Sequence, residues 1–429
     1  MKRLRYGTAA WQRYLRSLPR ADRPRPEVTK AVARIVRDVE RLGDAALVRW
    51  TERLDGVVLR KGQIRMERAE VRRLAARADR PLRKALAAMA TRIAAFHARQ
   101  LVPGFRLSLG PGSSVEEVVT PLDSAGLYVP GGAGAYPSSV LMNAIPALAA
   151  GVGDLWIATP PRALEASPAV AAAVVEVGLE ARVIRVGGAQ AIAALAYGTR
   201  SVPAVAKIAG PGNAYVAEAK RQVRGRVDVD REAGPSEVVI LADETADAGW
   251  VAADLLAQAE HGSGEETVVL VTTSPALADE VARLVAQGVN SVANRTAARR
   301  ALDRHGAIVI ARGIEEGIEA VNALAAEHAE VMVRKPDAVA ARVVAGAVFV
   351  GPWAPVAVGD YGVGPNHVLP TGGAARYASP LSVRDFQRRH SRVRLRRAGL
   401  AGITEDVVRV AQAEGFRGHA QSVLTRFEG

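Results

Sequence analysis

From residue 126 onward, short apolar runs of strand length alternate with longer stretches that have the apolar spacing of helices. The runs fall into two series of four: 127–129, 155–159, 182–186 and 207–209, then 238–242, 267–272, 307–311 and 347–350. This alternation is typical of parallel sheets covered by helices. It predicts two doubly wound α/β units, although strand count alone leaves a single barrel open.

Helical patterns flank these two blocks. Residues 26–55 have the spacing of two amphipathic helices, with breaks at Gly43 and Gly56, and residues 81–101 also look helical. The tail from about residue 381 shows helical patterns and no predicted strand. We therefore expect a separate helical arm at the end of the chain.

Length and composition limit the possible classes. With 429 residues, a prior of about 150 residues per domain suggests two or three domains. The chain has no cysteine, so disulfides, thiolate metal ligands and thiol nucleophiles are excluded. We find no apolar segment typical of a signal peptide or of a membrane-spanning helix. The expected protein is soluble and cytoplasmic.

The charge of the chain raises the question of nucleic-acid binding. The net charge is +13, and basic clusters lie near both ends. Aromatic residues make up only 4% of the chain and do not interleave with these clusters, as they would on a surface that stacks bases. A generally arginine-rich composition explains the charge, and no specific nucleic-acid site is predicted.

Four glycine-rich turns are expected at strand ends: 129–139, 186–195, 209–220 and 233–237. Turns at the carboxyl ends of parallel strands line the ligand crevice, and a helix N-terminus that follows favours an anion such as pyrophosphate. None is a full dinucleotide fingerprint, because Tyr215 stands where a third glycine would follow Gly210 and Gly212. Each turn alone is simple chain reversal, but four together favour a nucleotide-type ligand.

Two segments carry polar side chains suited to a metal or a substrate. Gln258 and His261 lie three residues apart at a predicted helix end, so both would project from one face, although a polar helix end is the plainer interpretation. Asp360 lies in a glycine-rich loop after the last predicted strand, where either a ligand or turn chemistry explains it. His367 in the same loop is interpreted as a loop-bonding residue.

The tail adds Glu414 and His419, five residues apart. Both could equally be ordinary exposed residues on the surface of a helix. A combination of N and O ligands would suit zinc or a similar divalent ion. Such a set would comprise Gln258, His261, Asp360 and His419, although spacing alone does not assemble it.

Glu327 and His328 lie side by side in the alanine- and valine-rich run 324–333. Neighbours in mid-helix diverge by about 100° and rarely share a target, whereas at the end of an element both can face one site. A histidine beside a glutamate suits general acid–base work near neutral pH. The segment alone is equally compatible with an exposed helix patch and with a catalytic pair.

Eight motifs occur in a fixed order: GLYVPGGAGAYPSSVLMNAIPA, GGAQAIAALAYGT, AGPGNAYVAEAK, AGPSEVVILAD, DLLAQAEHG, AEHAEVMV, GDYGVGPNHVLPT and LSVRDF. Together they resemble the histidinol dehydrogenase family, from about residue 25 to 425. The resemblance implies oxidation of L-histidinol to L-histidine with two NAD⁺, at the end of histidine biosynthesis. It also implies one zinc per site and a homodimer with intertwined subunits.

The resemblance implies a fold of two incomplete Rossmann-like domains with helical arms at both ends. The expected boundaries are an N-terminal arm over 1–25, a first Rossmann-like domain over 26–127 and 237–380, a second, NAD-contacting domain over 128–236, and a C-terminal arm over 381–429. In the family this last arm reaches the partner subunit's site.

Residue roles are implied motif by motif. Tyr128, Gln190 and Asn213 match the NAD-contacting residues. The implied zinc ligands are Gln258, His261, Asp360 and His419. The implied substrate contacts are Ser236, Gln258, His261, His328, Asp360, Glu414 and His419, of which Glu414 and His419 would act in trans. Glu327 is expected to activate water, and His328 to accept the proton in both oxidation steps.

Four positions depart from the family pattern. Ala326 and Ala329 replace the Pro and Leu that usually flank the Glu–His pair, Val356 stands where a Glu usually follows Pro355, and Gly262 replaces an Asp. All implied ligands are intact, so the departures bear on geometry and turnover rather than on reaction type.

Two alternatives remain. A family relative could oxidise a different amino alcohol or hydroxy substrate, but the presence of Ser236 and Glu414 argues against this. A basic nucleic-acid-binding protein could have a decayed active site, but the intact Glu327, His328 and Asp360 argue against decay.

Overall fold

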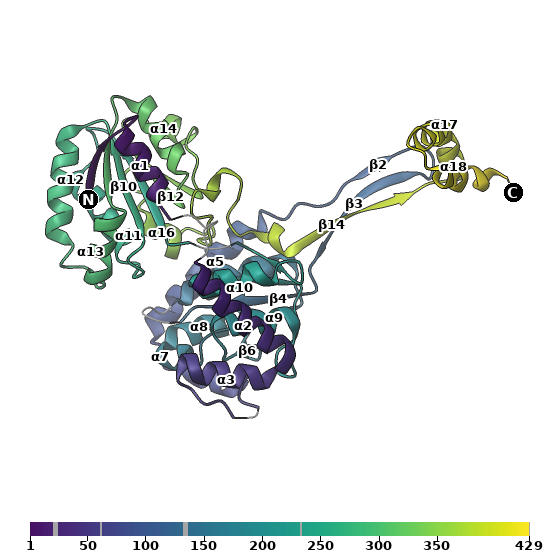
Figure 1. Cartoon of the computed structure of the whole chain (residues 1–429), viewed down its shortest axis with the longest axis horizontal. Helices are drawn as coiled ribbons and strands as arrows, with labels where there is room; N and C mark the ends of the chain where they lie inside the picture. Colours follow the sequence, from purple (N-terminus) through teal and green to yellow (C-terminus); the bar gives the residue numbers. More distant parts are fainter. Residues whose placement is uncertain (20–24, 61, 132–135, 232–233, 429) are drawn as a thin grey trace. The chain divides into compact units, whose positions relative to one another are not determined.

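The computed structural model describes residues 1–19, 25–60, 62–131, 136–231 and 234–428. The chain forms two compact units (Figure 1). The large unit comprises Met1–Gln100 and Leu122–Phe386, and the small unit comprises Leu101–Pro121 and Gln387–Gly429. No helix of the described ranges is long and apolar enough to cross a membrane.

The first sheet of the large unit, sheet A, has six parallel strands. Their order across the sheet is β1 (Lys2–Arg5), β11 (Ala307–Ile310), β10 (Thr267–Thr272), β9 (Glu237–Ala242), β12 (His328–Met332) and β13 (Ala347–Val350). Side chains alternate between the two faces, so each face presents its own apolar layer.

Helices cover both faces of sheet A. One face packs on α11 (Ala248–Ala259), α12 (Pro275–Gly288), α13 (Arg295–Arg304) and α16 (Val356–Tyr361). The other face packs on α1 (Ala9–Ser17), α14 (Ile314–Leu324) and α15 (Pro336–Ala340). Both faces are therefore buried, which explains why these strands read as continuous apolar runs.

The second sheet, sheet B, has five parallel strands. Their order is β6 (Val183–Ile184), β5 (Asp154–Ala158), β4 (Ser124–Tyr128), β7 (Lys207–Ala209) and β8 (Asp228–Val229). One apolar cluster contains α4 (Arg68–Ala75), α5 (Arg80–Ala98), α6 (Pro137–Ala150), α7 (Ala163–Ala166) and α8 (Pro168–Glu176). The other contains α2 (Pro26–Leu42), α3 (Asp44–Asp55), α9 (Gly188–Tyr197) and α10 (Ala214–Val223).

The strand order identifies the architecture. Numbered along the chain from β4, sheet B runs 3-2-1-4-5 across the sheet, and sheet A has the same order from β9 once β1 is set aside. This is the Rossmann order without its sixth strand. The prediction of an α/β fold with two incomplete Rossmann-like sheets is confirmed, and the alternative of a single barrel is wrong.

The small unit has an antiparallel sheet in the order β14 (Gln387–Arg394), β3 (Ser114–Pro121) and β2 (Arg106–Ser108). Helices α17 (Arg397–Ala413) and α18 (Arg417–Leu424) and the short turn η3 (Thr425–Phe427) complete it. Two other short helical turns, η1 (Ala374–Arg376) and η2 (Val383–Phe386), belong to the large unit.

The prediction that the tail contains no strand is wrong at β14. This strand, QRRHSRVR, is exposed along nearly its whole length, so it carries no apolar alternation for a sequence pattern to detect. The predicted strands also omit β1, β2, β3, β8 and β12. Strands β1, β2 and β8 are short, β3 is only partly buried and carries Glu116 and Glu117, and β12 carries Glu330 in the middle of its buried run.

The domain boundaries expected from the resemblance differ from the structure at several points. Leu101–Pro121, expected in the first Rossmann-like domain, belongs to the small unit together with Gln387–Gly429. Residues 1–25 include β1, which pairs with β11 of sheet A, so this segment is more than a helical arm; residues 20–24 lie outside the described ranges. The helices within 26–98 pack on sheet B and not on sheet A, because the apolar faces of α2 and α3 bury residues such as Val32 and Leu47 against α9 and α10.

Candidate active site

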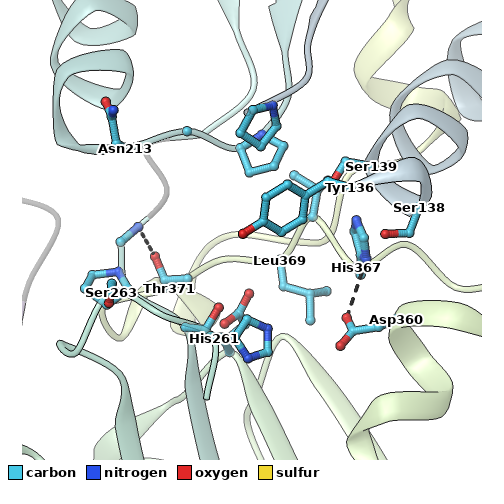
Figure 2. A pocket seen from close by; sticks show the side chains of 18 of the residues that line it. Tyr136, Ser138, Ser139, Asn213, His261, Ser263, Asp360, His367, Leu369 and Thr371 are labelled. Atoms are coloured by element: carbon cyan, nitrogen blue, oxygen red, sulfur yellow. Dashed lines mark hydrogen bonds and ion pairs between the residues drawn. The ribbon is translucent and has the colours of Figure 1, made fainter. Parts of the chain in front are cut away.

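A pocket of about 360 Å³ in the large unit brings together segments from both sheets (Figure 2). Its polar lining includes Tyr128, Asn213, Ser236, His261, Glu327, His328, Asp360 and His367. We call it the central pocket. Most side chains that sequence analysis singled out in the large unit therefore meet at one place.

The two sheets contribute opposite strand ends to the central pocket. Tyr128 ends β4 and Asn213 follows β7, as expected for ligands at carboxyl ends. Ser236 precedes β9 and Glu327 precedes β12, so sheet A contributes its amino ends. The expectation of carboxyl-end turns is thus correct for sheet B and wrong for the turn 233–237, of which residue 233 lies outside the described ranges.

Glu327 and His328 are buried, with exposed fractions of 7% and 4%. His328 is the first residue of β12, and both side chains line the central pocket. The alternative of an exposed helix patch is therefore wrong. The pair lies at the beginning of a strand, where two neighbouring residues can both reach one site.

Hydrogen bonds to Glu237 hold this pair in the absence of the usual proline and leucine. The Glu237 N–H donates to Glu327 Oε2 at 3.0 Å, and the Glu327 N–H donates back to Glu237 Oε2 at 3.2 Å. Ala325 ends α14 in the left-handed region at φ 46°, which turns the chain into β12. Ala326 and Ala329 are buried in the apolar layer of sheet A.

A backbone contact fixes the tautomer of His328. Its Nδ1 lies 3.0 Å from the carbonyl oxygen of Glu237, and a carbonyl oxygen can only accept. Nδ1 therefore carries the hydrogen, which leaves the Nε2 lone pair free. Burial lowers the pKa of His328, which outweighs the opposing charge of Asp360, so the neutral base is favoured.

Burial lowers the pKa of His328 but raises the pKa of Glu327. Burial raises the pKa of Glu327 to about 7, although the Glu237 N–H, the charge of His261 and the Ser236 side chain act against this rise. A carboxyl group with this pKa exists in both protonation states near neutral pH. It can therefore give and take protons under the same conditions.

Two of the three predicted metal ligands of the large unit line the central pocket. Asp360 and His261 line the central pocket, and Asp360 Oδ1 lies 3.5 Å from His367 Nδ1 (Figure 2). Burial opposes ionisation of Asp360, but His367, with smaller contributions from His328 and His261, lowers its pKa overall. Sequence analysis treated His367 as a loop residue, whereas the structure gives it a direct partner in the pocket.

Gln258 lies on α11 with an exposed fraction of 2%, and neither Oε1 nor Nε2 has a hydrogen-bond partner among the described residues. Helix α11 ends at Ala259, so His261 lies beyond it and not on its face, contrary to expectation. In the described part of the chain, no three His, Asp or Glu side chains gather around one point. Of the predicted zinc set, two such residues, His261 and Asp360, line the pocket.

The remaining predicted residues, Glu414 and His419, belong to the small unit. Glu414 follows α17 as its C-cap, and His419 lies on α18 with its ring stacked on Phe416 at 4.9 Å between centroids. Both are exposed. The lining of the central pocket comes from the large unit alone.

A second pocket, of about 560 Å³, adjoins the central one and is called the side pocket here. All three residues expected to contact NAD, Tyr128, Gln190 and Asn213, line it, and Tyr128 and Asn213 line both pockets. Gln190 Oε1 is buried without a partner among the described residues. Helices α2 and α3 add Arg34 and Trp50, which no sequence signal distinguished from other residues of amphipathic helices.

The turn after β7 requires a glycine at position 210. Gly210 has φ 119°, and a Cβ there would lie 2.1 Å from the carbonyl oxygen of Tyr128. The buried Lys220 and Asp230 hold this turn: Lys220 donates to the Gly210 carbonyl, and Asp230 Oδ2 accepts from the Gly210 N–H at 2.7 Å. Asn213 Oδ1 caps α10 by accepting from Tyr215 and Val216, so its amide nitrogen remains for other contacts.

Two Rossmann-like sheets that present a buried acid–base pair to a shared pocket define an enzyme of the α/β class. A family model described as histidinol dehydrogenase matches residues 18–427. The chain belongs to the histidinol dehydrogenase family.

Individual relatives agree with this assignment. The chain is 47% identical over 338 residues to a histidinol dehydrogenase of Halalkalibacterium halodurans, covering 78% of this chain and 79% of the relative. It is 43% identical over 404 residues to that of Cereibacter sphaeroides, covering 94% and 93%. The crystal structure of histidinol dehydrogenase from Elizabethkingia anophelis superposes with a TM-score of 0.92 at 30% identity, covering 100% of this chain and 98% of that one.

Proposed function

We propose that this protein oxidises L-histidinol to L-histidine through L-histidinal and reduces two NAD⁺ in doing so, as the last steps of histidine biosynthesis. The observation that carries the proposal is the buried Glu327–His328 pair in a pocket that adjoins the pocket lined by Tyr128, Gln190 and Asn213. Membership of the family supports the choice of substrate.

In the first step, the neutral His328 accepts the proton of the alcohol at Nε2. Its Nδ1–H bond to the Glu237 carbonyl keeps that nitrogen available, and its lowered pKa keeps the ring uncharged near neutral pH. The alcohol carbon then loses a hydride and becomes the aldehyde. NAD⁺, when bound, is the hydride acceptor.

In the second step, water adds to the aldehyde and the hydrate is oxidised. The chain has no cysteine, so a thiohemiacetal with the protein is excluded, and water is the proposed nucleophile. Glu327 is suited to take the proton of that water, because a carboxyl with pKa about 7 is partly ionised at neutral pH. His328 then accepts the proton of the hydrate, which makes it the base in both steps.

Three residues of the large unit and one of the tail are the proposed zinc ligands. Gln258 has a buried amide without a partner in the described ranges, and His261 and Asp360 line the central pocket. These three residues, with His419 from a partner subunit, would supply the N and O ligands that zinc accepts. When bound, zinc would hold and orient the amine and imidazole of the substrate. Ser236 and Glu414 are proposed as further substrate contacts.

The small unit favours a homodimer. Ala411 and Ala420 are the buried apolar residues of its described part, so it has almost no core of its own. Helix α17 exposes Ile403, Val407 and Val410 at helical spacing. We propose that a second copy covers this stripe and that Glu414 and His419 act at the partner subunit's site, in a cytoplasmic dimer.

The direct test of this function is NADH formation from L-histidinol by the purified full-length protein, with and without a strong chelator. We expect NADH in the first case, and a loss on chelation that zinc restores. Signal with other amino alcohols but none with L-histidinol would instead support a relative with a different substrate. No signal with any alcohol, together with salt-sensitive retention of DNA, would support the decayed, nucleic-acid-binding alternative.

A further inference from the structure

Two acidic residues, Glu330 on β12 and Asp254 on α11, have no part in the mechanism above and are called the acid pair here. Glu330 is on β12, two residues after His328, with an exposed fraction of 1%. Residues two apart on a strand point to the same face, and here this is the face that packs on α11 and α16. Asp254, half-buried on α11, interacts directly with the Glu330 carboxyl group.

Glu330 and Asp254 form a contact between two carboxyl groups inside the protein. Glu330 Oε1 accepts from the backbone N–H of Val356 at 2.6 Å, while Oε2 is buried and has no hydrogen-bond partner among the described residues. Two carboxylates are both acceptors and repel each other, so they form a hydrogen bond only if one of them is protonated.

The acid pair connects the three elements that carry the active site. Asp254 lies one turn before Gln258 on α11, Glu330 follows His328 on β12, and Val356 begins α16, which carries Asp360. Close packing limits how α16 can move: a Cβ on Gly359 would lie 2.5 Å from Phe349 Cζ. Because Asp360 is part of α16, any displacement of this helix would also move the Asp360 side chain.

We propose that Asp254 and Glu330 share one proton and that this acid pair positions α11, β12 and α16 so that Gln258, His328 and Asp360 face one substrate. The inference rests on the proposed function, but the two can be tested separately. Glu330 and Asp254 are positioning residues, because they act through the elements they join and do not touch the reacting atoms.

The surroundings of Glu330 make Asp254 its principal charged neighbour. In the sheet its register partners are Ile240 on β9 and Phe349 on β13, neither of which titrates. Helix α16 contributes the Val356 N–H, with Asp360 four residues further on, and the strand itself contributes His328. Burial, and then the charge of Asp254, raise the pKa of Glu330, and burial also raises that of Asp254.

The test compares Glu330→Gln, Glu330→Met and wild type, with Glu180→Gln as a matched control. Glutamine can accept from Val356 and donate to an ionised Asp254, so Glu330→Gln should keep kcat/KM with L-histidinol close to wild type. Methionine keeps the volume but makes neither bond, so kcat should fall by about 10- to 100-fold, the range expected when reacting groups are misplaced by less than 1 Å. Glu180 is also a buried glutamate, but it pairs with Arg68 and Arg72 away from both pockets.

The pH profile separates this role from a merely structural one. In wild type, kcat should decrease at alkaline pH as the pair loses its shared proton, and Glu330→Gln should remove that decrease while Glu180→Gln keeps it. A Glu330→Met protein with wild-type kcat, or a Glu330→Gln profile that coincides with wild type, would overturn the proposal. If Glu330→Met fails to fold, the Glu330→Gln profile still decides.

The proposed function could be wrong while the proposal about the acid pair is right. In that case wild type would not oxidise L-histidinol at all, and thermal unfolding against pH would test the shared proton independently of substrate. A midpoint difference between Glu330→Gln and wild type that does not change with pH would then refute it.

Discussion

At the scale of single residues, the chemistry depends on backbone groups as much as on Glu327 and His328 themselves. One residue, Glu237, supplies a carbonyl that fixes the His328 tautomer and an N–H that holds Glu327. Burial then moves the two pKa values in opposite directions, raising that of Glu327 and lowering that of His328. Both groups can therefore accept protons near neutral pH.

Replacing Glu327 by Gln tests the division of labour within the pair. We expect alcohol oxidation to survive in part, because His328 Nε2 is untouched, while aldehyde oxidation falls by about 10²- to 10⁴-fold, the usual contribution of a general base. Single-turnover NADH formation from L-histidinol and from L-histidinal measures the two steps separately. An equal loss in both steps would contradict separate roles.

Glu330→Gln has an expected effect on stability as well. The pKa of Glu330 is raised to about 9 in the folded protein, above the ordinary value of an unfolded chain. Its contribution to stability is therefore complete below the unfolded pKa and is lost as pH rises toward the folded one. The thermal unfolding midpoint of Glu330→Gln should therefore rise relative to that of wild type as the pH increases from 5 to 9. A gain that shrinks with pH would contradict this sign.

Residue identities were more predictable than residue geometry. The adjacency of Glu327 and His328, and the ligand types at Gln258, His261 and Asp360, can be read from the sequence and its family motifs. The roles of Glu237, His367 and Glu330 could not, because each depends on a contact between segments far apart in the chain. No local pattern encodes such a contact.

At the scale of elements, strand ends decide where ligands can go. Sheet B contributes the carboxyl ends of β4 and β7, and sheet A the amino ends of β9 and β12. The alternation of apolar runs and helices predicted both sheets, because strands buried on two faces leave a strong signal. It could not predict which end of each sheet faces the pocket, or the exposed strand β14.

Gly210→Ala tests the turn after β7. A Cβ there would collide with the Tyr128 carbonyl, and the backbone conformation is one that favours glycine, so we expect a cost of roughly 1–3 kcal/mol and a clear loss of NAD affinity. Titration of NADH fluorescence and thermal unfolding measure the two effects. Gly153→Ala is the matched control, because nothing lies within 4 Å of a Cβ at that position. Unchanged NADH affinity in Gly210→Ala would remove this turn from the cofactor site.

At the scale of the whole molecule, the proposed active site combines residues from two copies of the chain. The small unit buries almost none of its apolar side chains, and it carries Glu414 and His419. A tail that completes the partner subunit's site would explain both facts. The large unit alone supplies the acid, the base and the lining of both pockets.

Mixing two variants that should each form little L-histidine tests action in trans, with L-histidine formation as the activity that is measured. Glu327→Gln damages the large unit's site, and His419→Ala damages the tail. If tails act in trans, a heterodimer of the two has one site with an intact pair and an intact tail, so activity should return after dissociation and reassociation. Each variant treated alone is the control. No recovery, with heterodimers verified by native mass spectrometry, would indicate that each tail serves its own subunit.

The most direct test of the proposed function is the number of NADH molecules formed for each L-histidinol consumed by the full-length, zinc-loaded protein. The proposed function predicts two NADH, with L-histidine as the product and no free aldehyde accumulating, because one acid–base pair serves both oxidations. A single NADH with L-histidinal as the final product would contradict the role of Glu327, and no NADH would contradict the proposed function.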